Sequence, residues 1–200
     1  MCGEEAVARA GGGRLGSVVA TPVLQAGAIR LRPLEPADLD VLVAARSVGS
    51  GATPVGDEQA RRRFARRIEA SGRFHEGRLD FGIELAGRLV GSIEARQPRE
   101  GLPPGAYEIG ISFFDAADRG RGLGTTTVRL FTDYLFSDAA THRVQASTWV
   151  ENAPMRRVLE KLGFALEGVM RSFMPTPGGE RHDYALYAVT RDDWAAHRRG

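Results

Sequence analysis

The sequence contains a single cysteine, Cys2. One thiol cannot form an intramolecular disulfide and cannot build a cysteine-based metal site. A secretory signal is also lacking, because Glu4 and Glu5 come early and no apolar run of the required length follows them. These absences predict a protein of a reducing compartment, and we expect a cytoplasmic location.

Long hydrophobic runs and excess charge are missing as well. No uncharged apolar stretch approaches the roughly 20 residues that span a bilayer, which argues against membrane insertion. Lysine and arginine number 27 and aspartate and glutamate 25, for a formal net charge of +2. That balance is too small to indicate a nucleic-acid partner. The four histidines lack the helical or hairpin spacing of metal ligands, so we expect no metal.

The composition that is present is typical of one globular domain. The chain has 200 residues, of which 42% are hydrophobic and 26% charged. Residues 1–22 are rich in Gly, Ala and Arg without periodicity, and are expected to form a flexible tail before a domain at 23–200. A further flexible connector is expected at 49–56.

Hydrophobic periodicity predicts strands and helices in a mixed order. The sheet is expected to be of the α/β class (an α+β mixed sheet) with helices on its faces, because strands and helices do not alternate regularly. Trp149 and Trp194 are expected in the core. Strands are predicted at 29–34, 79–85, 89–96, 107–114, 143–150, 164–174 and 182–189, and helices at 35–49, 57–71, 122–139 and 154–162.

The helix at 57–71 carries five arginines, which suggest two alternative roles. A run of charges on a helix usually forms a solvated face, with Glu58 and Glu69 as partial partners. The alternative is that the cations meet an anionic ligand. The arginines are Arg61, Arg62, Arg63, Arg66 and Arg67.

A glycine-rich segment, Asp118 to Thr125, follows a predicted strand and opens a predicted helix. Closely spaced glycines let backbone N–H groups crowd around one anion, and a helix N-terminus adds partial positive charge. The segment therefore predicts a cradle for a polyphosphate. It is not a Walker loop, because no Lys follows the last glycine, and it is not a dinucleotide fingerprint, because Thr125 stands where the third glycine would be. The alternative is a glycine-rich helix start that serves chain geometry alone.

The loop resembles the pyrophosphate loop of the GNAT N-acetyltransferases, which reads Gln/Arg-x-x-Gly-x-Gly/Ala. Four further motifs, one before the loop and three after it, lie in the family's order over about residues 27–195. The last of them is similar to the branch that contains the RimJ and RimL ribosomal-protein acetyltransferases. The motifs are Arg119, Gly122 and Gly124; Tyr107–Gly110; His142–Val144 with Glu151-Asn152; Leu159–Phe164; and Glu167, Gly168, Arg171 and Asp183.

The resemblance implies acetyl-CoA as donor and a primary amine as acceptor. It also implies a fold with a central, mostly antiparallel sheet in which two neighbouring parallel strands, 107–114 and 143–150, splay apart. The pantetheine arm would lie in that gap, beside a bulged backbone N–H near Ile111 to Phe113. Glu108 would act as the general base. Asn152 would hydrogen-bond the pantetheine, or would simply cap a helix. Residues implied to hold the cofactor are Ile111, Phe113, Arg119, Gly120, Arg121, Gly122, Gly124, Thr125 and Asn152.

The chain departs from the family at two expected proton donors. Leu159 replaces a frequent Tyr, and Met155 replaces the Ser that is frequent in the Rim branch. Tyr184 and Tyr187 are alternative donors, and His182 with Asp183 is expected near the acceptor mouth. The alternatives to an acetyltransferase are a non-catalytic acyl-CoA-binding module and a transferase that uses another donor such as succinyl-CoA. Exposed strands at the C-terminal end would allow a homodimer.

Overall fold

The computed structural model describes residues 22–45, 57–97, 101–176 and 178–199, so the expected tail and the connector at 49–56 lie outside the described residues except for residue 22. The helices are α1 (Leu39–Ala45), α2 (Asp57–Ala70), α3 (Leu123–Ser137), α4 (Ala153–Lys161) and α5 (Arg191–His197). The strands are β1 (Leu24–Ala26), β2 (Ile29–Arg32), β3 (Arg78–Leu85), β4 (Arg88–Arg96), β5 (Ala106–Phe113), β6 (Arg143–Trp149), β7 (Ala165–Pro175) and β8 (Arg181–Thr190).

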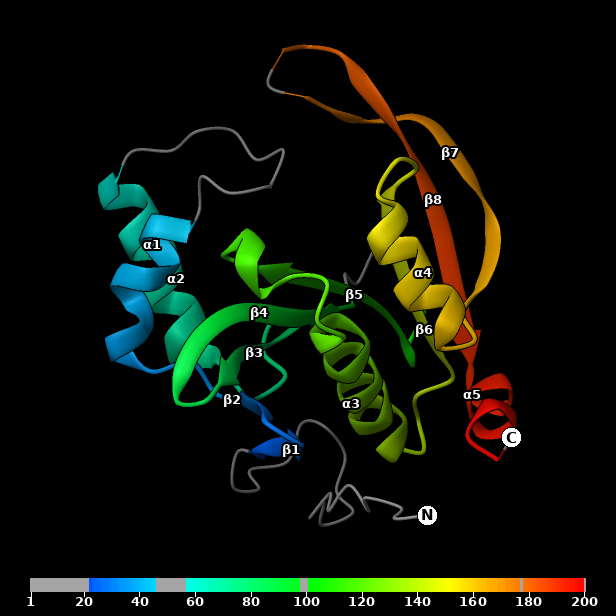
Figure 1. Cartoon of the computed structure of the whole chain (residues 1–200), viewed down its shortest axis with the longest axis horizontal. Coiled ribbons are helices and arrows are strands. Elements are labelled where there is room, and N and C mark those ends of the chain that lie inside the picture. Colours follow the sequence, from blue (N-terminus) through cyan, green and yellow to red (C-terminus); the bar gives the residue numbers. More distant parts are fainter. Residues whose placement is uncertain (1–21, 46–56, 98–100, 177, 200) are drawn as a thin grey trace.

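The strands form one sheet with the order β1-β2-β3-β4-β5-β6-β8-β7 (Figure 1). Among these strands β5 and β6 run parallel, and the other neighbours are antiparallel. The predicted fold class, a mixed and mostly antiparallel sheet with one parallel pair, is confirmed.

A tight turn joins β3 to β4. Ala86 and Gly87 both have positive φ, 51° and 78°, and Leu85 pairs with Arg88 across the turn. Two successive residues with positive φ give the backbone twist that a two-residue hairpin needs. The predicted strands, 79–85 and 89–96, leave residues 86–88 between them, so the predicted connection is one residue too long.

Helices cover both faces of the sheet. Phe81 of β3 packs against Phe131 of α3, with ring centroids 6.0 Å apart. Asp80, the preceding residue, accepts a hydrogen bond from Arg67 of α2 at 2.7 Å. Because neighbouring residues of a strand point to opposite faces, α3 and α2 lie on opposite sides of the sheet. The main core lies between the sheet and α3.

The chain ends in a helix that the periodicity does not predict. Thr190 and Asp193 form a reciprocal capping box at the start of α5, and Trp194 is only 4% exposed. Trp194 is thus a core residue, as predicted, whereas Trp149 is 39% exposed and the prediction for it is wrong.

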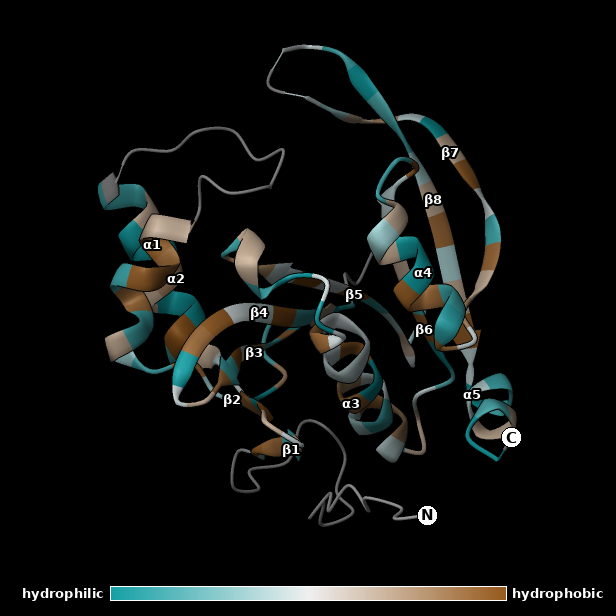
Figure 2. Ribbon diagram, in the orientation of Figure 1, coloured by the Kyte–Doolittle hydropathy of each residue, from teal (hydrophilic) through white to brown (hydrophobic). Residues whose placement is uncertain are grey.

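The β7–β8 hairpin extends beyond the rest of the sheet (Figure 1). Every residue of β7 is exposed except the half-buried Met170. Hydrophobic bands nevertheless mark β7 in Figure 2. Leu166, Val169 and Phe173 are large exposed apolar side chains of this strand. Within the described residues, no helix is long and apolar enough to cross a membrane.

Candidate active site

A gap opens between the two parallel strands. The β5–β6 ladder has three pairs and ends at Glu108↔Gln145, although β5 runs on to Phe113 and β6 to Trp149. Over the same stretch β5 stays paired with β4, as far as Gly91↔Phe113. The two parallel strands therefore diverge beyond Glu108, which confirms the predicted splaying.

Backbone donors of β5 line this gap. The N–H of Phe114, just beyond β5, donates to the carbonyl of Val90 in β4 at 2.9 Å. Hydrogen-bonding direction alternates along a strand, so Ile111 and Phe113 direct their N–H groups away from β4 and into the gap. The β4–β5 register is regular through Ile93↔Ile111 and Gly91↔Phe113, so the prediction of a bulge is wrong. The divergence of β6, not a bulge, leaves these donors facing the gap.

The glycine-rich loop ends at α3, beside the gap. Gly120 and Gly122 have φ of 74° and 77°, and nothing lies within 4 Å of where a Cβ would stand at either residue. Gly122 is the N-cap of α3 and supplies no side-chain cap, so the first-turn N–H groups keep their capacity for an external acceptor. A Cβ on Gly124 would lie 3.6 Å from Val158 of α4 and 3.9 Å from Phe113 of β5. These features fit an open anion cradle between the two walls of the gap.

Two arginines fix the N-terminal end of this loop. Asp118, 3% exposed, accepts a hydrogen bond from Arg88 at 2.9 Å, and this bond is the main cause that raises the pKa of Arg88 above its ordinary value. Arg119 donates to the carbonyl of Phe113 at 3.4 Å, which ties the loop to the end of β5. Arg121 is exposed, and Thr125 lies half-buried in the first turn of α3.

Glu108 lies at the point where the strands part. Its Oε1 accepts hydrogen bonds from Arg96 at 3.0 Å and from Ser147 at 3.3 Å, and its Oε2 accepts one from Gln145 at 3.3 Å. The side chain is 27% exposed. One carboxylate thus connects β4, β5 and β6 at the base of the gap.

A row of alternating charges continues from Glu108 to α2. Arg96 lies 3.5 Å from Glu94, Glu94 also pairs with Arg78, and Asp80 accepts hydrogen bonds from Arg78 and Arg67, each at 2.7 Å. Arg67 is therefore held against the sheet, and the prediction of a fully solvated arginine face on α2 is wrong for it.

Two other α2 arginines are also paired. Arg61 pairs with Asp40 at 2.7 Å, and Arg62 pairs with the predicted partner Glu58 at 3.0 Å. With Arg67, three of the five predicted cations are engaged by carboxylates, which weakens the case for an anionic ligand on this helix.

Asn152 caps α4 on the other side of the gap. Its Oδ1 accepts the N–H of Met155 at 3.3 Å, and its Nδ2 donates to Thr148 of β6 at 3.0 Å. Of the two roles expected for Asn152, its side chain therefore performs helix capping in this structure. Leu159, in the place of the expected Tyr, is fully buried and cannot donate a proton.

Aromatic side chains, two exposed and two half-buried, continue the face that carries Glu108. Trp149 follows Ser147 by two residues on β6, so the two side chains share a face. The Trp149 ring lies 4.2 Å from the ring of His182, and Tyr184 is the register partner of Trp149. Phe173 of β7 packs on Tyr184 at 5.8 Å. We call Trp149, Phe173, His182 and Tyr184 the aromatic wall.

The second tyrosine considered as a proton donor is engaged elsewhere. Tyr187 is fully buried, donates to Glu160 at 2.7 Å and accepts from Arg156 at 3.1 Å. Within the described ranges no group of three or more His, Cys, Asp or Glu residues could hold a metal ion.

Comparisons with known proteins agree with this geometry. The family model described as an acetyltransferase (GNAT) domain matches residues 28–165. Among relatives, a probable N-acetyltransferase of Bacillus subtilis, YjcK, is 34% identical over 65% of this chain and 68% of its own length. A kanamycin resistance protein of Rhizobium radiobacter is 34% identical over 45% of this chain and 76% of its own.

Among solved structures, Mycobacterium smegmatis RimJ in complex with CoA-disulfide superposes with a TM-score of 0.68. It is 23% identical, and the match covers 86% of this chain and 90% of that one. This likeness supports the shared fold. From its matching family model, the chain belongs to the GNAT acetyltransferase family and is an acyltransferase enzyme.

Proposed function

We propose that the protein transfers the acetyl group of acetyl-CoA directly to a primary amine. The observation that carries this proposal is the early end of the β5–β6 ladder at Glu108↔Gln145. The gap that opens there contains inward-facing backbone donors, an open glycine cradle at its mouth and a carboxylate at its base.

The glycine loop would hold the diphosphate of the donor. Gly120, Arg121, Gly122, Gly124 and Thr125 supply the N–H groups, the helix N-terminus and one flexible cation. Arg119 would contribute by holding the loop against β5 through its bond to Phe113. Asn152 would approach the pantetheine while keeping its cap on α4.

The backbone N–H groups of Ile111 and Phe113 would polarise the thioester carbonyl. Preorganised donors stabilise the negative charge that develops on such an oxygen. In the transfer the amine nitrogen forms a bond to the acetyl carbon, and the carbon–sulfur bond breaks with its electron pair going to sulfur.

The proton of the attacking amine must leave during the reaction, because an ammonium has no lone pair. Glu108 would accept this proton, directly or through water, since its carboxylate stands where the strands part. Leu159 and Met155 offer no proton for the departing thiolate, which would be protonated by solvent or leave as the anion.

The acceptor would approach along the aromatic wall, on the face that carries Glu108. Flat exposed rings favour an apolar or cationic group beside the reacting amine. A peptide N-terminus, which the resemblance to the Rim branch implies, and a small polyamine, which the relative named a kanamycin resistance protein suggests, are both suitable acceptors. A succinyl donor gains no support, because the α2 arginines are mostly paired.

Thiol release from acetyl-CoA tests the proposal against a panel of N-terminal peptides, polyamines and aminoglycosides. We expect amine-dependent release with at least one member and formation of the N-acetyl product by mass spectrometry. Tight CoA binding with no turnover of any amine would contradict transfer to amines. Faster turnover of succinyl-CoA than of acetyl-CoA would contradict the proposal that acetyl-CoA is the donor.

A further inference from the structure

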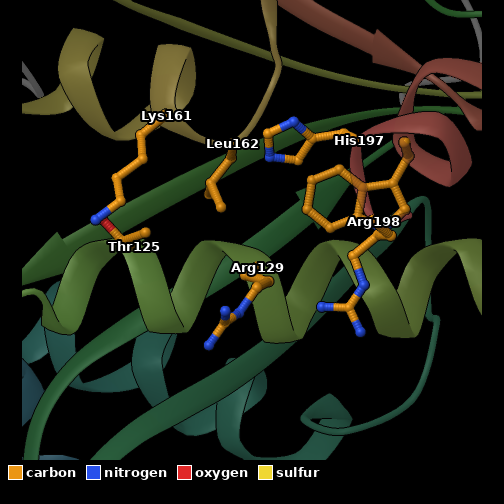
Figure 3. A pocket seen from close by; sticks show the side chains of 7 residues that line it. Thr125, Arg129, Lys161, Leu162, His197 and Arg198 are labelled. Atoms are coloured by element: carbon orange, nitrogen blue, oxygen red, sulfur yellow. The ribbon is translucent and has the colours of Figure 1, made fainter. Parts of the chain in front are cut away.

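A basic pocket lies beside the glycine loop, on the α3 and α4 side of the sheet (Figure 3). It has a volume of about 310 Å³ and is lined by residues of α3, α5 and the C-terminal end of α4. Trp194 and Leu162, both buried, supply its apolar lining. The other lining residues are Thr125, Arg129, Lys161, His197 and Arg198.

Three permanent cations from three helices meet at this pocket. In Figure 3, Lys161 points from the end of α4 toward Thr125, and the guanidinium groups of Arg129 and Arg198 lie along α3. Arg198 is 3.5 Å from Asp133, a carboxylate two turns beyond Thr125 on α3. In the described part of the chain, neither Arg129 nor Lys161 has an ion-pair partner. Unpaired cations that converge on one pocket favour an anionic ligand.

The position of the pocket relates it to the glycine loop. Thr125 belongs to both, and Arg129 follows it by one helical turn, about 5.4 Å along the axis of α3. CoA carries a phosphomonoester on the 3′ oxygen of the same ribose whose 5′ oxygen bears the diphosphate. One ribose ring can span the step from the loop to Arg129.

We propose that this pocket binds the 3′-phosphate of CoA and selects donors that carry it. The inference rests on the proposed use of an acyl-CoA donor. Arg129, Lys161 and Arg198 supply the donors, and the Thr125 hydroxyl bridges the two phosphate sites. Charge-assisted hydrogen bonds between guanidinium and phosphate are stronger than neutral ones and give geometric specificity.

The local fold supports this arrangement. Gly163, two residues beyond the end of α4, has a φ of 78°, and a Cβ there would lie 3.0 Å from the ring of His197. The absence of a side chain there lets α5 approach the end of α4 closely. The pocket therefore depends on a helix, α5, that lies beyond the residues matched by the family model, which end at 165.

Calorimetric binding of CoA and of 3′-dephospho-CoA tests the proposal. We expect the protein to bind CoA about tenfold or more tightly than the dephospho form, as for loss of a charge-assisted contact. In Arg129→Gln and Lys161→Gln this ratio should fall toward one, because CoA binds more weakly while dephospho-CoA is unaffected. Arg63→Gln, an exposed cation of α2 on the opposite face of the sheet, is the matched control and should keep the ratio.

Three results would overturn the assignment. Equal affinity of the unaltered protein for the two ligands would show that the pocket does not bind the 3′-phosphate. The proposed function would still stand. A similar loss for both ligands in the variants would assign the cations to general binding or folding. Failure of the unaltered protein to bind either ligand would reject the acyl-CoA site and this subsite together.

Discussion

The hydroxyl of Ser147 donates to the Glu108 carboxylate at 3.3 Å, across the point where the β5–β6 ladder has just ended. A side-chain bond thus joins the two strands where backbone pairing stops. With Arg96 and Gln145 it fixes the carboxylate on three strands. A group held in this way keeps its position relative to a substrate in the gap, which is the requirement for efficient proton transfer.

Replacing Glu108 with glutamine tests its part in the reaction. The amide keeps the shape of the side chain but cannot accept the amine proton. We expect kcat/KM to fall about 100-fold or more, as for loss of a general base, and the acidic limb of the pH–rate profile to disappear. Glu167→Gln removes an exposed carboxylate that pairs with Arg143 and should leave the rate nearly unchanged. Equal rates for Glu108→Gln and the unaltered enzyme across pH would remove Glu108 from the mechanism.

Alanine at Gly120 or Gly122 tests the phosphate cradle. Positive φ costs an alanine roughly 1 kcal/mol, and a Cβ would enter the open space that the diphosphate requires. We expect the Kd for CoA to rise about tenfold. Gly87→Ala is a matched control, because Gly87 has a φ of 78° and equally open surroundings in the β3–β4 turn. The control should lose similar stability in a thermal melt while its Kd stays constant; a parallel rise in Kd would refute the cradle.

Trp149→Ala tests the aromatic wall. Loss of an exposed ring should raise the KM for the amine about tenfold, through lost stacking or cation–π contact, and leave the KM for acetyl-CoA unchanged. Trp149→Phe, which keeps an aromatic face, should restore most of the affinity. Steady-state kinetics with both substrates varied separate the two constants. A change confined to the KM for acetyl-CoA would place the acceptor elsewhere.

Local patterns predict the elements of this fold well because each depends on neighbouring residues. Strands and helices from β2 to β8 follow hydrophobic periodicity, and the residues of the glycine loop are enough to predict it. Hydrophobic periodicity does not predict α5, because the helix has only seven residues, although Thr190-x-x-Asp193 is a capping-box signal.

The site was harder to predict where it depends on contacts between distant segments. The charge pattern of α2 predicts a solvated Arg67, because its partner Asp80 lies on another element. The sequence of β6 predicts a buried Trp149, because helices elsewhere in the chain decide which strand faces are covered. The basic pocket combines α3, α4 and α5, so no short motif could indicate it. Only the family resemblance predicts the splaying of β5 and β6, because paired residues of the two strands lie 37 positions apart and neither strand's own sequence indicates its partner.

Acid should weaken a charge cluster around Arg32, which is remote from the gap. Arg32 donates to Asp38 at 2.7 Å and to Glu84 at 2.7 Å, and Asp38 and Glu84 are both buried. Burial pushes the pKa of Asp38 upward, but hydrogen bonds from Arg32 and from the Glu35 backbone outweigh it and hold that pKa below its ordinary value. The hydrogen bond from Arg32 likewise lowers the pKa of Glu84.

Groups with lowered pKa values stabilise the fold above their unfolded pKa of about 4, and the contribution is lost as the pH falls through their folded values. We therefore expect the free energy of unfolding by urea to fall between about pH 5 and pH 2. Arg32→Met leaves two buried carboxylates without their shared cation and should cost about 3 kcal/mol at neutral pH, with a shallower dependence below about pH 4. Arg62→Met, which breaks only the exposed pair with Glu58, should cost less than about 0.5 kcal/mol. Equal losses in the two variants would mean that the Arg32 cluster adds no more than a surface ion pair.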